Sequence, residues 1–233
     1  MSTIKSISES NAPINQEIRR LEAIFDKQKS ACKEQRIPGL SLRKDRLARL
    51  RNVIQSHQEE IVTAISEDFG GRSRMETRML EIAIVTDSIR HASKQLKGWM
   101  KSQKRHVDMT YWPHSAYVRY EPKGVVGIIS PWNYPLAMAL NPLVDALAAG
   151  NRAIIKPSEL SPATSDLIAK MISQTFDESE VAVITGGADI AAHFTSMKWD
   201  HLFFTGSTNI GRKVAEAAAS NLVPTTLELG GKS

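Results

Sequence analysis

The chain of 233 residues is long enough for one large domain or two small ones, and its 42% apolar residues can fill a sizeable core. Its 30 Lys and Arg exceed its 25 Asp and Glu by five. The basic residues alternate with acidic and apolar ones in stretches such as KDRLARLR, which favours solvated helix faces and argues against a nucleic-acid partner.

The single cysteine, Cys32, excludes an intrachain disulfide and fits a reducing compartment. The opening stretch MSTIKSISESNAPINQE is polar and lacks the apolar segment of a secretory signal. No run of about eighteen uncharged apolar residues is present, so the sequence predicts no membrane span. We therefore expect a cytoplasmic protein.

The first hundred residues have the periodicity of helices. Apolar residues recur at helical spacing over residues 15–36, 42–69 and 76–100, with Gly70-Gly71 between the last two segments. We interpret residues 1–104 as a helical lead-in that forms one layer. Its histidines are isolated, and metal ligands come in spaced clusters, so we expect no metal site.

Residues 105–121 have a different composition. The stretch VDMTYWPHSAYVRY is rich in β-branched and aromatic residues around a Pro-His turn, which predicts a pair of strands within residues 107–120.

From residue 122 onward, short apolar strands alternate with helices. We expect strands at 125–130, 152–156, 181–185, 201–205 and 225–229, and helices at 136–149, 162–176, from 188 and at 209–220. Ser161 precedes Pro162 and is a candidate N-cap. The pattern predicts an α/β fold, a Rossmann-like parallel sheet with helices on both faces, preceded by the helical N-terminal layer. Such a sheet would bind its ligand at the carboxyl ends of the strands.

Polar residues follow the first two of these strands. Asn133 stands between two prolines in PWNYP, and its side-chain NH₂ could stabilise an oxyanion by about 3 kcal/mol, or simply bond its own loop. Lys156 and Glu159 in KPSE could hold the hydroxyls of a ribose, or form a surface ion pair at a helix start.

The last two strands end in glycine-containing loops. Gly206 and Gly211 bracket a loop that opens a helix, where backbone N–H groups could bind an anion. The spacing matches neither G-x-G-x-x-G nor a P-loop. Glu228 precedes Gly230-Gly231 and could act as a general base on water, or be an exposed residue at a strand end.

The combination is more specific than its parts. The order of PWNYP, GN-x₄-KPSE, FTGST-x-x-G and LELGGK resembles the aldehyde dehydrogenase superfamily. The similarity covers residues 122–233, which the resemblance implies form a dinucleotide-binding domain, and the helical lead-in is similar to that of the family. The resemblance also implies that residues 105–121 are a bridging or oligomerisation element. EPKGVVGIISPWNYP and TLELGGKS are most similar to the branch that oxidises fatty and aromatic aldehydes, including coniferyl aldehyde.

The resemblance implies a role for each candidate residue. Asn133 would be the side-chain half of an oxyanion hole, and Glu228 would activate the water that hydrolyses a thioester. The cofactor residues it implies are Lys156 and Glu159 at the adenosine ribose, Trp132, Gly206 and Ser207 along the pyrophosphate, Ile210 near the adenine, Gly211 in the same loop, and Leu229 and Gly230 at the nicotinamide. The implied cofactor is NAD, because the Glu159 carboxylate repels a 2′-phosphate; NADP is often tolerated in this branch.

The family's nucleophilic cysteine lies beyond LELGGK, and nothing in the pattern matches Cys32 to it. The resemblance therefore implies the N-terminal part of an NAD(P)-dependent aldehyde dehydrogenase, without the catalytic domain and inactive alone. The complete enzyme would be a homodimer or higher homo-oligomer acting on a small-molecule aldehyde. The alternatives are a non-catalytic nucleotide-binding module and a vestigial interaction protein.

Overall fold

The computed structural model describes residues 2–231. The helices are α1 Ser2–Glu34, α2 Leu40–Ser56, α3 Gln58–Asp68, α4 Arg74–Thr77, α5 Ala83–Trp99, α6 Pro135–Ala149, α7 Pro162–Thr175, α8 Ala188–Ser196 and α9 Thr208–Ala219. A π-helical turn, η1 Arg78–Ile82, joins α4 to α5, and η2 Met109–Tyr111 is a 3₁₀ turn. The strands are β1 Gln103–Arg105, β2 Ala116–Val118, β3 Val125–Ile129, β4 Arg152–Lys156, β5 Val181–Val183, β6 His201–Gly206 and β7 Thr225–Leu229.

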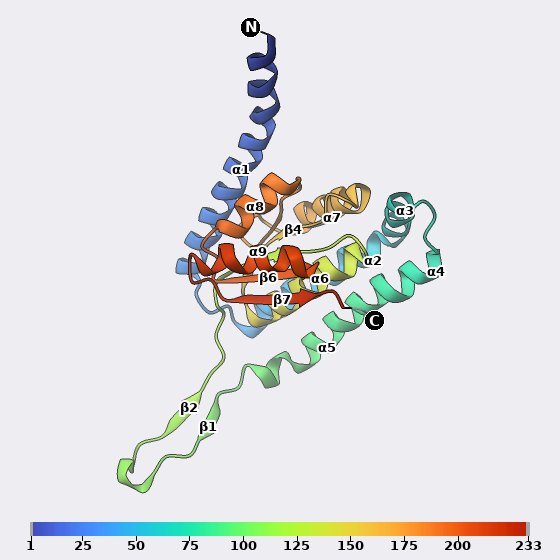
Figure 1. Ribbon diagram of the computed structural model, residues 1–233. Coiled ribbons are helices and arrows are strands. Elements are labelled where there is room, and N and C mark those ends of the chain that lie inside the picture. The colour runs from blue at the N-terminus through green and yellow to red at the C-terminus, as the bar shows by residue number, and fades with distance from the viewer. Residues whose placement is uncertain (1, 232–233) are drawn as a thin grey trace.

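The central sheet has the order β5-β4-β3-β6-β7, and each of its neighbouring strand pairs is parallel (Figure 1). Every residue of β3, β4 and β5 is buried, which explains why these strands are continuous apolar runs in the sequence. Helices cover both faces. The predicted α/β fold with a Rossmann-like parallel sheet is confirmed.

One face of the sheet is covered by α6 and α7, and α2, α3 and α5 pack on the outside of these two helices. The core between these layers is continuous and includes Leu47 and Ile54 of α2, Leu140 and Leu143 of α6, and Ile155 of β4. The sheet is therefore separated from α2, α3 and α5 by a complete layer of helices.

The other face is covered by α1, α8 and α9. Leu21 and Ile24 of α1 lie in one apolar cluster with Phe194, Trp199 and residues of the sheet. The structure thus refines the predicted helical layer, because its first helix packs directly on the strands while the others lie on the opposite side. The proposed boundaries at residues 104 and 121 remain an interpretation.

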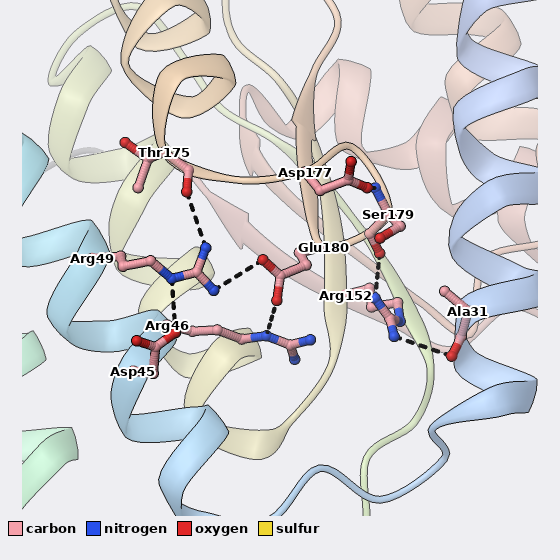
Figure 2. A network of polar contacts seen from close by, with 9 residues as sticks. All are labelled: Ala31, Asp45, Arg46, Arg49, Arg152, Thr175, Asp177, Ser179 and Glu180. Carbon is pink, nitrogen blue, oxygen red and sulfur yellow. Dashed lines mark hydrogen bonds and ion pairs between the residues drawn. The ribbon is translucent and has the colours of Figure 1, made fainter.

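Arg46 corrects the expectation that KDRLARLR forms a solvated face. This side chain is 1% exposed, and its Nε lies 2.8 Å from Glu180 Oε1. Arg49 Nη2 lies 2.9 Å from Glu180 Oε2, and its Nη1 donates to the carbonyl of Thr175 (Figure 2). The two arginines join α2 to the α7–β5 connection. Their charges are tolerated there because Glu180 compensates them.

The strands β1 and β2 form an antiparallel pair that projects from the body of the molecule (Figure 1). The prediction that both strands lie within residues 107–120 is wrong for the first one, which spans Gln103–Arg105. Residues 109–111 instead form a 3₁₀ turn, because the Asp108 carboxylate accepts hydrogen bonds from the N–H and hydroxyl of Thr110.

Candidate active site

A cleft opens at the carboxyl ends of the central strands. The chain runs from β3 outward through β4 to β5 and then crosses to β6, on the other side of β3. The switch point of the sheet therefore lies between β3 and β6, where doubly wound sheets bind ligands. The cleft has a volume of about 690 Å³ and is lined by Pro131, Trp132, Asn133, Met138, Asn141, Pro142, Asp145, Phe203, Thr205, Gly206, Ser207, Glu228, Leu229 and Gly230.

Asn133 and Glu228 share this cleft although they follow different strands. Asn133 lies in the loop between β3 and α6 and is exposed. Glu228 is exposed on β7, where it pairs in register with Thr205 of β6. An amide donor and a carboxylate thus face one open volume, a combination suited to stabilising an oxyanion and removing a proton from water.

The end of β7 is held against the loop that follows β6. Leu229 pairs in register with Gly206, and Gly230 donates its N–H to the Gly206 carbonyl at 3.2 Å. A Cβ on Gly211 would lie 2.5 Å from Leu229 Cδ2. Only glycine fits at that position without displacing Leu229, so the predicted loop and the end of β7 form one close-packed surface.

Lys156 and Glu159 form an ion pair beside the cleft, at the end of β4. Lys156 is 2% exposed, and its Nζ lies 2.8 Å from Glu159 Oε2 and 3.0 Å from the Pro157 carbonyl. Burial raises the pKa of Glu159, but the hydrogen bond and charge of Lys156 outweigh it, so the pKa is lowered overall. The sequence left two roles open for this pair, a surface ion pair or a ribose site. In the structure the Lys156 side chain is buried and that of Glu159 is 47% exposed, and the pair lies at the end of β4, the strand beside β3.

The N-termini of the helices at this edge differ in what they bind. Two N–H groups at the start of α6 donate to the Glu81 carboxylate, and two at the start of α7 donate to Asp68. The start of α9 has only its own Ser207, whose Oγ accepts from the Ile210 N–H at 3.4 Å. A helix N-terminus favours an anion, so α9 is the one of these three that has no carboxylate in place.

Ser161 does not cap α7 as predicted. It occupies the N-cap position, but its side chain makes no capping bond and donates instead to the Ser158 carbonyl. The Asp68 carboxylate of α3 takes over this role. It is a stronger acceptor than a hydroxyl, and it reaches the helix from a segment 95 residues earlier in the chain.

Cys32 lies outside the cleft. It is a residue of α1, near the end of that helix, and packs against the apolar cluster on the face of the sheet that α1, α8 and α9 cover. Burial raises the pKa of the Cys32 thiol, although Arg152 acts in the opposite direction. A thiol with a raised pKa is a poor nucleophile near neutral pH, so the position and chemistry of Cys32 both argue against catalysis.

The sequence did not single out one wall of the cleft. Met138, Asn141 and Asp145 line it from a single face of α6. Burial raises the pKa of Asp145, and Asn141 Oδ1 is buried with no hydrogen-bond partner among the described residues. These three residues are spaced by three and four positions, which places them on one face of a helix, and this spacing could have indicated the wall from the sequence. It was hard to recognise because most of the other residues of α6 are apolar.

Within residues 2–231, no group of three or more His, Cys, Asp or Glu side chains is arranged to hold a metal ion. None of the helices described is both long and apolar enough to cross a membrane.

Comparison with known proteins gives one family. Residues 14–233 match the model described as "Aldehyde dehydrogenase family". The "Probable coniferyl aldehyde dehydrogenase" of Pseudomonas aeruginosa is 46% identical over 218 residues, which are 94% of this chain and 46% of that protein.

The solved structures agree with this match. "Substrate bound state of Staphylococcus Aureus AldH" has a TM-score of 0.88 at 40% identity and covers 91% of this chain and 46% of that one. PnpE in complex with nicotinamide adenine dinucleotide, from Pseudomonas sp. WBC-3, has a TM-score of 0.82 at 29% identity, covering 93% of this chain and 44% of that one. The chain spans about half the length of the relatives it matches.

Proposed function

Because the chain belongs to the aldehyde dehydrogenase family, we propose that it forms the NAD-binding part of an enzyme that oxidises an aldehyde to the carboxylic acid. The observation that carries the proposal is the cleft at the switch point, which brings Asn133 and Glu228 together with the loop after β6. The names of the relatives support an aromatic substrate such as coniferyl aldehyde. A fatty aldehyde is the alternative that the resemblance in sequence implies.

The residues around the cleft fit a dinucleotide. Lys156 and Glu159 would bond the hydroxyls of the adenosine ribose, and the N-terminus of α9 with Gly206 and Ser207 would hold the pyrophosphate. Ile210 is 49% exposed next to this loop and offers an apolar contact for the adenine. Trp132, Leu229 and Gly230 would border the nicotinamide. The Glu159 carboxylate favours NAD, and its pairing with Lys156 leaves room for some use of NADP.

When bound, NAD supplies a hydride acceptor. The residues of this chain would act on the two steps around that transfer. When a thiolate attacks the aldehyde carbon, the carbonyl oxygen gains negative charge and the Asn133 NH₂ donates to it, which is worth about 3 kcal/mol. After the thioester forms, Glu228 takes a proton from the water that attacks it, and the carboxylic acid and the thiol are released.

The attacking thiol does not come from residues 1–233. Cys32 is the only cysteine among them, it lies on α1 outside the cleft, and its pKa is raised by burial. We infer that the 233-residue polypeptide binds NAD but does not turn over an aldehyde by itself.

Calorimetry and an NADH absorbance assay on this polypeptide test both parts. We expect saturable NAD binding and no steady NADH production above a blank without protein. Turnover would overturn the inference about the thiol. Absence of NAD binding up to millimolar concentration would overturn the assignment of the cleft. In the aldehyde-oxidising enzyme that contains this chain, Glu228→Gln should stop thioester hydrolysis. Unchanged hydrolysis would contradict the role of Glu228 as the base and would favour the alternative, that this chain serves only to bind the nucleotide.

We also propose that the β1–β2 hairpin joins subunits of a homodimer or larger homo-oligomer. Its exposed aromatic residues support this role, since Trp112 is 75% and Tyr117 60% exposed. Light scattering on the enzyme with Trp112→Ser and Tyr117→Ser should show a smaller assembly than the unchanged protein.

A further inference from the structure

Glu81 is a fully buried carboxylate that the proposed mechanism does not use. It lies in the π-helical turn η1 and has 0% exposure. Its Oε2 accepts hydrogen bonds from the N–H groups of Leu136 at 2.8 Å and Ala137 at 3.0 Å. Its Oε1 accepts from Arg72 Nη1 at 3.2 Å. Burial raises the pKa of Glu81 although these bonds and the charge of Arg72 act in the opposite direction, so a carboxylate at this depth depends on its partners.

These bonds are made at the point where the loop carrying Asn133 ends. The helix α6 begins at Pro135, and the two N–H groups that Glu81 binds are those that follow it directly. Such N–H groups have no partner within their own helix. By binding them, Glu81 fixes where α6 starts and hence where the loop returns to the sheet.

Both neighbours of Asn133 contact the same group of side chains. The Arg72 guanidinium that pairs with Glu81 lies 5.1 Å from the centre of the Tyr134 ring and 3.6 Å from that of Phe69. The Phe69 ring in turn lies 6.0 Å from the ring of Trp132. Of the two neighbours of Asn133, Tyr134 therefore contacts Arg72 directly and Trp132 is linked to it through Phe69.

The π-helical turn gives Glu81 its direction. Such a turn inserts an extra residue into a helix, and π-helical turns are often found at functional sites. Since one residue corresponds to about 100° of rotation in an α-helix, a regular helix from Arg74 to Trp99 would direct this side chain elsewhere. The π-helical turn therefore allows the Glu81 side chain to reach the N–H groups at the start of α6.

We propose that Glu81 is a positioning residue for Asn133. It acts through the start of α6 and through Arg72, and it holds the Asn133 amide where an oxyanion would form. The proposal rests on the oxyanion role given to Asn133 above, but the ordering of the loop can be measured separately from that role.

The first experiment uses the 233-residue chain and measures the order of the Asn133 backbone amide by nuclear magnetic resonance relaxation. We expect an order parameter near about 0.85 in the unchanged chain and below about 0.6 in Glu81→Gln, whose NH₂ cannot accept from Arg72. An unchanged order parameter in a Glu81→Gln chain that remains folded by circular dichroism would overturn the proposal. If this variant does not fold, Glu81→Asp keeps the charge, shortens the reach to α6 and should show the same loss of order.

The matched control is Glu180→Gln. Glu180 is also a carboxylate paired with arginine, in this case with Arg46 and Arg49, but it lies in the α7–β5 connection, away from the cleft. We expect Glu180→Gln to lower the unfolding midpoint and to leave the order of Asn133 unchanged. Equal loss of order in both variants would mean that Glu81 is only structural, and would overturn the proposal.

The second experiment is a double-mutant cycle in the aldehyde-oxidising enzyme that contains this chain. We expect Asn133→Ala to lower kcat by roughly 10²-fold and Glu81→Gln by roughly ten- to a hundredfold. In the Asn133→Ala background, Glu81→Gln should change kcat by less than about twofold, because its effect passes through Asn133. Additive effects would overturn the proposal. An Asn133→Ala enzyme with unchanged kcat would instead overturn the oxyanion role, while the order of the loop would still decide the role of Glu81.

Discussion

Asp68 provides a sharp test of how α7 is held. Its carboxylate accepts from the N–H groups of Ala163 at 2.9 Å and Thr164 at 2.8 Å, and from the Thr164 hydroxyl at 2.6 Å. Ser161, the residue that the sequence indicates as the cap, donates only a 3.4 Å bond to the Ser158 carbonyl. Replacing each by alanine separates the two explanations.

The expected magnitudes follow from these contacts. Loss of a helix cap costs about 0.5–2 kcal/mol. The Thr164 side chain is 1% exposed, so its hydroxyl would be left without a partner at a further cost of about 1–3 kcal/mol. Asp68→Ala should therefore lower the free energy of unfolding by about 2–4 kcal/mol. Ser161→Ala should lower it by less than about 1 kcal/mol, because the Ser158 carbonyl still accepts from Ser165 Oγ at 2.8 Å.

Urea unfolding of the 233-residue chain, followed by circular dichroism, measures both values. Thermal unfolding should agree, with a shift of about 2–4 °C for each kcal/mol. If Ser161→Ala destabilises the chain as much as Asp68→Ala does, the local cap is the effective one and the reasoning from the structure is refuted.

Three further outcomes are expected. Gly211→Ala would bring a Cβ to 2.5 Å from Leu229 Cδ2 and should turn this 40% exposed side chain away, which should raise the Kd for NAD; an unchanged Kd by calorimetry would contradict a contact between Leu229 and the cofactor. Lys156→Met removes the cation 2.8 Å from Glu159 and should weaken NAD binding, and an equal or lower Kd would contradict the ribose assignment. The Asp177 carboxylate accepts from the Ser179 N–H and from Lys27, which lowers its pKa from 3.8 to about 2. Because the pKa is lower in the folded chain, the stabilisation is present above pH 3.8 and is lost as the pH falls toward 2. The urea midpoint of Asp177→Asn should vary less over that interval than that of the unchanged chain; parallel curves would contradict the shift.

The sequence predicts β3, β4 and β5 well because these strands are buried throughout, and burial of this kind leaves a run of apolar residues. The strands β6 and β7 are only partly buried, and their apolar and β-branched residues still indicate them. It also places some of its candidate residues at one cleft, since the carboxyl ends of parallel strands meet at one edge, whereas Lys156, Glu159, Ile210 and Gly211 do not line that cleft. Asn133 and Glu228 were found in this way although they are far apart in the chain.

The rest depends on partners that no local pattern contains. Arg46 was interpreted as solvated because its neighbours in sequence are charged, and its partner Glu180 lies 134 residues away. In the sequence, Asp68 and Glu81 are ordinary helix residues. Asp68 caps α7 and Glu81 caps α6 only because the helical segments that carry them pack against those two helices. The α6 wall of the cleft was missed because one face of an apolar helix cannot be told from the other without its neighbours.

The capping of α6 and α7 from a distant segment bears on how the chain can be divided. A fragment that begins near residue 122 would contain the whole sheet, yet the first turns of two of its helices would have open N–H groups. The first helix adds a third dependence, because Gln28 Nε2 donates to the carbonyls of Ala153 and Glu178. The sheet and the helices that precede it therefore complete each other's backbone hydrogen bonding. They should unfold in a single cooperative transition rather than as two independent modules.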